Sequence, residues 1–509
     1  MSKINPRVRM IQNSVQANLL QRCNHIREEL QQGVKKPYKE VIDICWGDAH
    51  SGGTKPLTFV RQCVSVRFLS RSVSCVFQVI AVCIYPELLQ ETTIAPDVKE
   101  RARRLLRECP GGSVAGTMDS GQVPVSVPLY VSSGSYAAAK GIPFVQDGVC
   151  EFISKRDGGV PSYPEDIFIC SGSQNALMFV LKLLVHGKGL AQTGVLTPIP
   201  CYPTFVMGLT ELGAAMVPYY LCEDDGWCLH VEELRRALAT SRSHCNPRIL
   251  YVINPGNPTG HVQSRESIEE VIRFAAEEEL FIFADEVYQD MMHAEGSQFV
   301  SYKKVLFEMG PQYSNTVELA SFHSVSKGIM GECGLRCGYV ELVNLDPSVK
   351  QSVTSAFNTE RNTAVIGQIA LNIMVDPPKP GDPSYPTFSQ EVKSIRDNLV
   401  HNVRQVQETV EALPGTSFQA GSGGIYAYLR LDLPQKALLQ AKEEGTDPDL
   451  MYCSRLLEEE GVCLVVGKEH GQQEGTYHIR ICIGTTSTRL KEVLRRLKSF
   501  HLRFLNEFS

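Results

Sequence analysis

The chain has 509 residues, 43% of them hydrophobic and 21% charged, a composition that is typical of folded globular proteins and excludes a disordered or fibrous chain. Its net charge is only −6, from 50 basic and 56 acidic side chains, so we expect no nucleic-acid partner, because binding to a phosphate backbone needs a basic surface. The apolar runs stay short of the roughly 18 residues of a membrane span, and we expect no membrane partner.

A helix is expected around residues 16–32, within an N-terminal arm that covers residues 1–56. This arm is too small to stand alone, so we expect it to pack with the small domain at the other end of the chain. Short apolar runs separated by helical patterns then fill the centre of the chain. This alternation predicts the α/β class, with a large domain that holds a mainly parallel mixed sheet covered by helices. The runs are residues 167–170, 194–198, 249–253, 280–284, 317–322 and 338–343.

The first run ends in Gly172-Ser173-Gln174, and an apolar helical pattern follows it. A helix N-terminus offers free N–H groups and the positive end of a dipole, so this motif is a candidate phosphate site. A serine cap on a core helix explains it about equally well. After the second run, Tyr202 could stack on a planar ring or be a buried core tyrosine.

Residues 254–260 read NPGNPTG and follow the third run. Prolines and glycines make such a turn rigid, so Asn257 could there donate a hydrogen bond to a ring oxygen, although the segment could equally be a simple turn. Asp285 follows the fourth run, at a buried strand end where a carboxylate is costly unless it is paired. A protonated pyridine nitrogen would be a fitting partner, and an arginine is the alternative.

The segment SFHSVSKGIMGECGLR, from Ser321 to Arg336, directly follows the fifth run. Its Lys327 could form a Schiff base with an aldehyde cofactor, while Ser324 and Arg336 hold an attached phosphate. An ordinary solvated lysine is the alternative. Because all of these motifs follow successive strands, and ligands of open α/β sheets bind just outside the strand ends, we expect them to form one site.

Proline-rich residues 377–388 mark the expected domain boundary, because prolines interrupt both helices and sheets. We therefore place the large domain over 57–376, a linker at 377–388 and a small α+β domain over 389–509. Within the last of these we expect a helix over 389–412, strands over 425–431 and 478–483, and a final amphipathic helix over 489–504.

Seventeen cysteines are scattered along the chain with no Cys-x-x-Cys pair. Disulfide frameworks are typical of short secreted chains, so we expect reduced, mostly buried thiols and no zinc site. The N-terminus has neither the apolar region of a signal peptide nor the long Ser- and Arg-rich tract of a transit peptide. We therefore expect a cytoplasmic protein, with the mitochondrion less favoured.

The chain resembles the alanine aminotransferases, a family of pyridoxal-phosphate enzymes with the fold type I architecture. The lysine segment and NPGNPTG are common to many fold type I aminotransferases, whereas MGECG together with EGTYH is particular to the alanine aminotransferases. The matching motifs are GDAHS from residue 47, CIYPELL from 83, RDGGVP from 156, NPGNPTG from 254, ADEVYQD from 284, SFHSVSKGIMGECG from 321 and EGTYH from 474.

The resemblance implies a role for each candidate residue. Lys327 would bond to pyridoxal 5'-phosphate and move the substrate proton, Asp285 would pair the ring nitrogen, and Tyr202 would stack on the ring. Asn257 and Tyr288 would contact the ring hydroxyl oxygen, and Arg480, with Asn257, would bind the substrate carboxylate. The phosphate ligands would be Gly172, Ser173, Gln174, Ser324 and Arg336, together with Tyr136 from the other subunit.

The implied reaction is a ping-pong transfer of the amino group between L-alanine and 2-oxoglutarate, which gives pyruvate and L-glutamate. The implied partners are small amino acids and 2-oxo acids, and a second copy of the chain in a homodimer with shared active sites. Two other functions stay open: another pyridoxal-phosphate aminotransferase, lyase or synthase of the same fold, and an inactive binding protein of that fold.

Several segments depart from the family pattern. Gly172-Ser173-Gln174 replaces Gly-Ala-Ser, residues 360–363 read ERNT in place of Leu-Cys-Pro-Pro, and residues 467–470 read GKEH where a proline and small residues are expected. Residues 63–77 and 115–133 have no counterpart in the family. We expect these two segments to loop out or to be absent from the working protein.

Overall fold

The computed structural model of the chain describes residues 6–11, 14–45, 47–55, 57, 78–84, 86–108, 138–359 and 363–509. Tyr136, the unusual segments 63–77 and 115–133, and residues 360–362 lie outside the described residues. The described chain forms two compact units, each assembled from separate stretches of sequence. The first unit comprises Met1–Thr54, Leu184–Val300 and Arg396–Ser509, and the second comprises Lys55–Leu183 and Ser301–Ile395.

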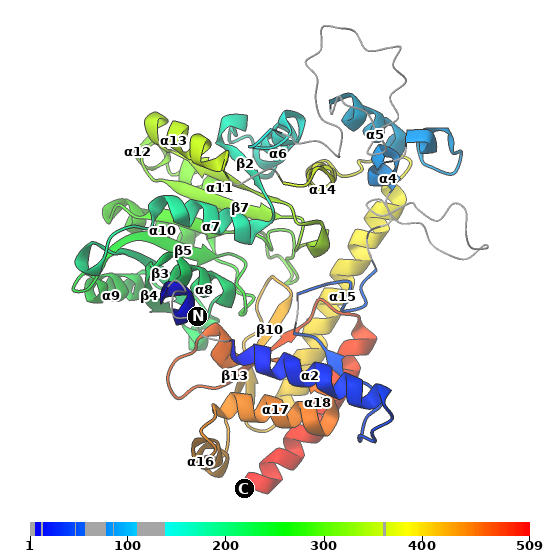
Figure 1. Cartoon of the computed structure of the whole chain (residues 1–509), viewed down its shortest axis with the longest axis vertical. Coiled ribbons are helices and arrows are strands. Elements are labelled where there is room, and N and C mark those ends of the chain that lie inside the picture. The colour runs from blue at the N-terminus through cyan, green and yellow to red at the C-terminus, as the bar shows by residue number, and fades with distance from the viewer. Residues whose placement is uncertain are drawn as a thin grey trace. The chain divides into compact units, whose positions relative to one another are not determined.

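Four strands of the first unit run parallel in the order β6-β5-β3-β4, and helices connect them, which confirms the predicted α/β class (Figure 1). Helix α10 is one of these connections: the side chain of Ser264 caps it, and it buries Ile268, Val271 and Ile272. The bounds are β3 (Thr193–Ile199), β4 (Ala215–Tyr220), β5 (Asn246–Ile253), β6 (Phe281–Asp285), α8 (Pro203–Leu212), α9 (Val231–Ser241) and α10 (Arg265–Glu277).

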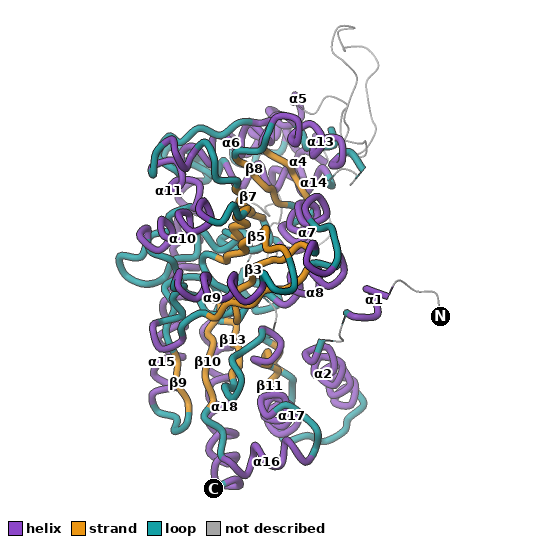
Figure 2. Tube along the Cα trace, turned by 90° about the vertical axis from the view of Figure 1, so that its left-hand side faces the viewer, coloured by secondary structure: helices purple, strands orange, loops and turns teal. Residues whose placement is uncertain are grey.

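The rest of the first unit comes from the two ends of the chain. Strands β12, β13, β10 and β9 form an antiparallel sheet in that order, and β1 pairs in parallel with β11. Figure 2 shows α2 and α17 beside β11. The bounds are α1 (Pro6–Met10), α2 (Val15–Gln31), β1 (Ile42–Asp43), β9 (Thr416–Phe418), β10 (Tyr426–Leu431), α16 (Gln435–Glu443), α17 (Pro448–Glu460), β11 (Val462–Cys463), β12 (Val465–Val466), β13 (His478–Cys482) and α18 (Ser487–Phe508).

Strands of the second unit are antiparallel, in the order β2-β8-β7. The bounds are α4 (Gln78–Ile84), α5 (Pro96–Glu108), α6 (Pro143–Arg156), β2 (Ile167–Cys170), α7 (Ser173–Leu184), α11 (Tyr302–Glu308), α12 (Pro311–Ser314), β7 (Leu319–Ser324), β8 (Gly338–Val343), α13 (Pro347–Phe357) and α14 (Val365–Val375). Helix α15 (Tyr385–Glu411) begins in this unit and ends in the first. None of the helices in the described ranges is long and apolar enough to cross a membrane.

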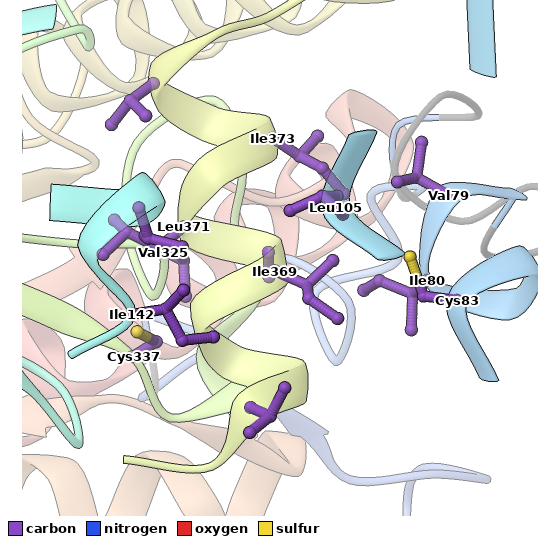
Figure 3. Packing of buried hydrophobic residues seen from close by; sticks show 14 of the residues in the cluster. Val79, Ile80, Cys83, Leu105, Ile142, Val325, Cys337, Ile369, Leu371 and Ile373 are labelled. Atoms are coloured by element: carbon purple, nitrogen blue, oxygen red, sulfur yellow. The ribbon is translucent and has the colours of Figure 1, made fainter. Parts of the chain in front are cut away.

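A hydrophobic core fills the second unit between α4, α5 and α14 (Figure 3). Val325 and Cys337 both belong to this core and are fully buried, and the Val325 N–H donates to the Cys337 carbonyl oxygen at 3.1 Å. Burial of an aliphatic side chain of this size contributes about 1.5–3 kcal/mol. The core therefore anchors both ends of the loop, residues 325–337, that carries Lys327.

Candidate active site

Lys327 lies in a tight turn shortly after β7. The Gly331 N–H donates to the Lys327 carbonyl oxygen at 3.3 Å, and the Glu332 N–H donates to that of Val325 at 2.9 Å. The lysine is half-buried, and the neighbouring Ser326 hydroxyl is buried with no hydrogen-bond partner among the described residues. A buried hydroxyl without a partner is unfavourable. This turn therefore fits a polar ligand at the Ser326 hydroxyl.

Arg336 and the start of α7 form an anion cradle in the same unit. Gly172 has φ +94°, a conformation that favours glycine, and α7 begins at the next residue, Ser173. The Arg336 guanidinium covers this turn: its Nη2 donates to the Ser171 carbonyl oxygen at 3.4 Å, and a Cβ on Gly172 would lie 2.9 Å from the same nitrogen. A guanidinium beside a helix N-terminus is a suitable site for a phosphate.

The register of the strands explains why these groups meet. Ser324 at the end of β7 and Cys170 at the end of β2 are both opposite Gly338, the first residue of β8. Arg336 comes two residues before Gly338, so its side chain can reach the turn after β2. Gln174, which replaces the expected serine, lies half-buried in the first turn of α7.

Asp285 belongs to the first unit, where it ends β6 and is only 5% exposed. The hydroxyl of Tyr251, on the neighbouring β5, donates to Asp285 Oδ2 at 3.0 Å. Burial and the charge of Asp285 raise the pKa of Tyr251 well above its ordinary value, so the phenol keeps its proton and remains a donor. Phe205 of α8 stacks on the Tyr251 ring with centroids 3.7 Å apart and fixes it in place.

Arg480 is a buried guanidinium on β13 that is 8% exposed. Its Nη1 donates to Asn257 Oδ1 at 2.9 Å and its Nη2 to the Cys45 carbonyl oxygen at 2.8 Å, while the Tyr426 ring lies 4.0 Å from its Cζ. Its Nε has no hydrogen-bond partner within the described part of the chain. The guanidinium is therefore held in one orientation with donor capacity left for a ligand.

Tyr288 lies close to the Arg480 guanidinium, and Tyr202 lies close to Tyr251. The Tyr288 ring is edge-on to Tyr426, with centroids 6.1 Å apart. Burial and Tyr426 raise the pKa of Tyr288 well above its ordinary value, against the opposing charge of Arg480. Tyr202 precedes α8 and is one of the groups whose charge raises the pKa of Tyr251.

The predicted site residues thus fall into two groups, one in each unit. The first unit brings together Tyr202, Asn257, Asp285, Tyr288 and Arg480. The second unit brings together Gly172, Ser173, Gln174, Ser324, Lys327 and Arg336. The role of each residue remains a prediction.

Sequence reasoning missed His470, which ends a turn after β12, the strand paired with the Arg480 strand. Its Nδ1 donates to the Cys201 carbonyl oxygen at 2.8 Å, and its own carbonyl oxygen accepts from the Cys201 N–H at 2.9 Å, directly before Tyr202. Burial and the charge of Arg480 lower its pKa well below 6.5, so Nε2 is a hydrogen-bond acceptor. The departure at residues 467–470 was the signal that pointed to this turn.

Tyr251 and Tyr426 were also missed. Both lie inside strands of mostly apolar residues, where a tyrosine is predicted to be part of the core. Only the structure shows that Tyr251 donates to Asp285 and that Tyr426 covers Arg480.

The family described as aminotransferase class I and II matches residues 132–497. The chain therefore belongs to the class I and II aminotransferases, and it is a pyridoxal-phosphate-dependent enzyme of this class.

The names of its relatives are more specific than the name of the family. The chain is 45% identical over its whole length to alanine aminotransferase 2 of Xenopus laevis, covering 88% of that protein, and 44% identical over 99% of its length to alanine aminotransferase 1 of Homo sapiens, covering 95%. The solved alanine aminotransferase of Pyrococcus furiosus has the same fold, with a TM-score of 0.69 at 18% identity over 98% of this chain and all of that one. This similarity confirms the predicted fold type I architecture.

The residues present fit the cofactor of this class. Pyridoxal phosphate carries a phosphate, a ring nitrogen and an aldehyde. The cradle of Arg336 and Gly172 suits the phosphate, and Lys327 supplies an amine in the loop that joins β7 to Arg336. The buried Asp285 carboxylate, fixed by Tyr251, suits a protonated ring nitrogen.

Proposed function

We propose that the chain is an alanine aminotransferase that transfers the amino group between L-alanine and 2-oxoglutarate, with pyruvate and L-glutamate as products. The buried, pre-oriented guanidinium of Arg480 carries this proposal, because all four compounds have the α-carboxylate that it would bind. The relatives that share 44–45% of its residues are named as alanine aminotransferases, which supports the choice of substrate.

Each group of side chains has a task in this reaction. The cofactor, when bound, supplies an aldehyde and a ring that withdraws electrons from the substrate Cα. Lys327 would act as the base that takes the Cα proton and returns it, and Asp285 would keep the proton on the ring nitrogen. Arg336 and the first N–H groups of α7 would hold the phosphate.

Arg480 would bind the carboxylate through a fork of two parallel hydrogen bonds. A guanidinium has five N–H donors, of which one on Nη1 and one on Nη2 are already directed at Asn257 and Cys45. The Nε hydrogen and the remaining Nη hydrogens are left for the two carboxylate oxygens. A lysine ammonium carries the same charge but cannot reproduce this planar fork.

The substitution Arg480→Lys tests the proposal in a coupled assay of alanine plus 2-oxoglutarate, with and without added pyridoxal phosphate. Loss of charge-assisted hydrogen bonds worth about 1.5–3 kcal/mol should raise KM for both substrates by one to two orders of magnitude and lower turnover. Arg430→Lys is the matched control, because Arg430 lies on the adjacent β10 and pairs with Glu223. Unchanged KM values in Arg480→Lys, or ammonia instead of a 2-oxo acid as product, would contradict the proposal.

We also propose that the enzyme is a cytoplasmic homodimer with shared active sites. The family resemblance around Tyr136 supports the dimer, and the free thiols of the described cysteines support a reducing compartment. The large domain over 57–376, the linker and the small domain over 389–509 are likewise proposed as the domain organisation.

A further inference from the structure

Buried thiols and a carboxylate meet where the N-terminal arm joins β11. Cys45 Sγ lies 3.3 Å from Cys463 Sγ, although the two residues are 418 positions apart in the chain. A carboxylate oxygen of Asp43 lies within 4.8 Å of both sulfur atoms. Cys45 is 3% exposed and Cys463 is fully buried.

The parallel pairing of β1 with β11 produces this cluster. Asp43 is opposite Cys463 in the register, and the Ile44 N–H donates to the Cys463 carbonyl oxygen at 3.3 Å. Cys23 is a further buried thiol on α2, a helix that contacts β11, but it is not part of this group. Prediction from the sequence found no metal site because it compared cysteines that are neighbours along the chain.

We propose that Asp43, Cys45 and Cys463 form a binding site for a thiolate-preferring divalent metal ion of the zinc or cadmium type. Two thiolates and a carboxylate are donors that such ions prefer. Tetrahedral coordination with metal–sulfur distances of about 2.3 Å separates two sulfur atoms by about 3.8 Å. The observed spacing of 3.3 Å needs to widen only slightly.

Neighbouring groups already form the outer shell that a metal site needs. The Gln16 side chain donates to Cys45 Sγ at 3.3 Å, and the Cys45 N–H donates to Asp43 Oδ1 at 3.0 Å. Arg27 Nη2 donates to Asp43 Oδ2 at 3.3 Å. Such contacts orient ligands and stabilise their negative charge. Asp43, with 12% of its side chain exposed, lies on the side from which an ion can enter.

Metal binding is coupled to protons. A cysteine thiol must lose its proton before its sulfur can bind a metal ion. Binding forms two metal–sulfur bonds, breaks two S–H bonds and releases two protons to the solvent. The apparent affinity therefore increases as the pH rises.

The cluster is also connected to the proposed substrate site, and this step rests on the proposed function. The Cys45 carbonyl oxygen accepts the hydrogen bond from Arg480 Nη2. A metal ion between the two sulfur atoms would move the Cys45 side chain away from Cys463, and this carbonyl group with it. We expect metal binding to raise KM for carboxylate substrates.

The test is a titration of the full-length holoenzyme with Cd²⁺ after removal of metal by a chelator. We expect one equivalent bound per chain, two protons released, and the ultraviolet absorption of Cd²⁺–thiolate bonds. Cys45→Ser and Cys463→Ser should each weaken binding at least tenfold. Cys228→Ser should still bind one equivalent of Cd²⁺, because Cys228 lies elsewhere, in a β-bridge with Cys222.

No stoichiometric binding to the parent, or equal binding by Cys45→Ser, would overturn the site. If loss of a thiol prevents folding, Asp43→Asn is the second variant. An undiminished affinity of that variant for Cd²⁺ would also overturn the proposed metal site. The titration needs no substrate, so it is independent of the proposed activity. Binding that leaves the KM of an active enzyme unchanged would overturn the coupling to Arg480.

Discussion

Tyr251 illustrates how a single core residue can support an active site. Its ring packs on Phe205 and its hydroxyl donates to Asp285, a carboxylate that would face the cofactor nitrogen. A buried polar group that loses its hydrogen-bond partner costs about 1–3 kcal/mol. The contact therefore contributes both to stability and to the orientation of the carboxylate.

We predict that Tyr251→Phe lowers the free energy of unfolding by about 1–3 kcal/mol and also reduces turnover, because Asp285 loses its fixed orientation. Urea unfolding measures the first effect, and the coupled assay measures the second. Tyr219→Phe is the control, because it also removes a buried hydroxyl that donates a hydrogen bond. That bond goes to the Tyr251 carbonyl oxygen at 2.8 Å, so Asp285 keeps its hydrogen bond from Tyr251. Normal turnover in Tyr251→Phe would show that the hydrogen bond has no role at the site.

At this scale, sequence reasoning identified residues whose type is unusual for their position, such as Asp285 at the end of an apolar run. It could not find Tyr251, because a tyrosine inside an apolar strand has no unusual feature. The partner of Tyr251 lies 34 positions away on another strand. Only the pairing of β5 with β6 shows that the two side chains meet.

Among the secondary-structure elements, the turn between β2 and α7 shows how a glycine can shape a binding site. Gly172 has a positive φ, and the Arg336 guanidinium lies close to it. A side chain at this position would therefore strain the backbone and collide with the guanidinium. The turn therefore holds the guanidinium against the start of α7, where the phosphate of the cofactor is expected to bind.

We predict that Gly172→Ala weakens the affinity for pyridoxal phosphate by about tenfold or more, because the new Cβ displaces the Arg336 guanidinium. Gly159→Ala is the matched control: Gly159 has φ +100°, but no atom lies within 4 Å of its added Cβ. Both variants carry the same kind of backbone strain. Titration of the apoenzyme with the cofactor should show weaker binding by Gly172→Ala than by Gly159→Ala. Equal affinities would contradict a phosphate site at Arg336 and Gly172.

The six apolar runs predicted β2, β3, β5, β6, β7 and β8 to within three residues at either end. No run predicted β4, which contains Pro218 and is only partly buried. Strand β5 begins earlier than its apolar run because exposed residues extend it, and β7 continues through the buried polar residues His323 and Ser324. Strand direction was harder to predict. The loop over residues 325–337 contains only the short 3₁₀ helix Cys333–Leu335, too little for a parallel crossover, so β7 and β8 are antiparallel.

At the scale of the whole molecule, buried neutral histidines contribute to the response to acid. Burial lowers the pKa of His261 to about 4 and that of His323 to about 3, and it also lowers the pKa of His293, His470 and His501. An unfolded chain binds protons at these positions near pH 6.5. Below that pH the unfolded state binds more protons than the folded state, so stability falls as the pH falls.

We predict that His323→Phe makes the protein less sensitive to acid. The phenylalanine keeps the ring that stacks on Phe152 but cannot be protonated. Between pH 6 and pH 4, the dependence of the unfolding free energy on pH should decrease by about 1.4 kcal/mol per pH unit. His25→Phe, on the exposed side of α2, serves as the control. An unchanged slope in His323→Phe would contradict this assignment.

The pairing of β1 with β11 has a consequence for biosynthesis. The hydrogen bonds that join Cys45 to Cys463 and Gln16 to Leu464 connect residues 418 and 448 positions apart. During translation, the first residues must therefore wait for β11 and β12 to leave the ribosome before their apolar face and thiols are covered. A nascent chain that stalls before this point exposes α2 and Cys45, and such a chain is a substrate for chaperones.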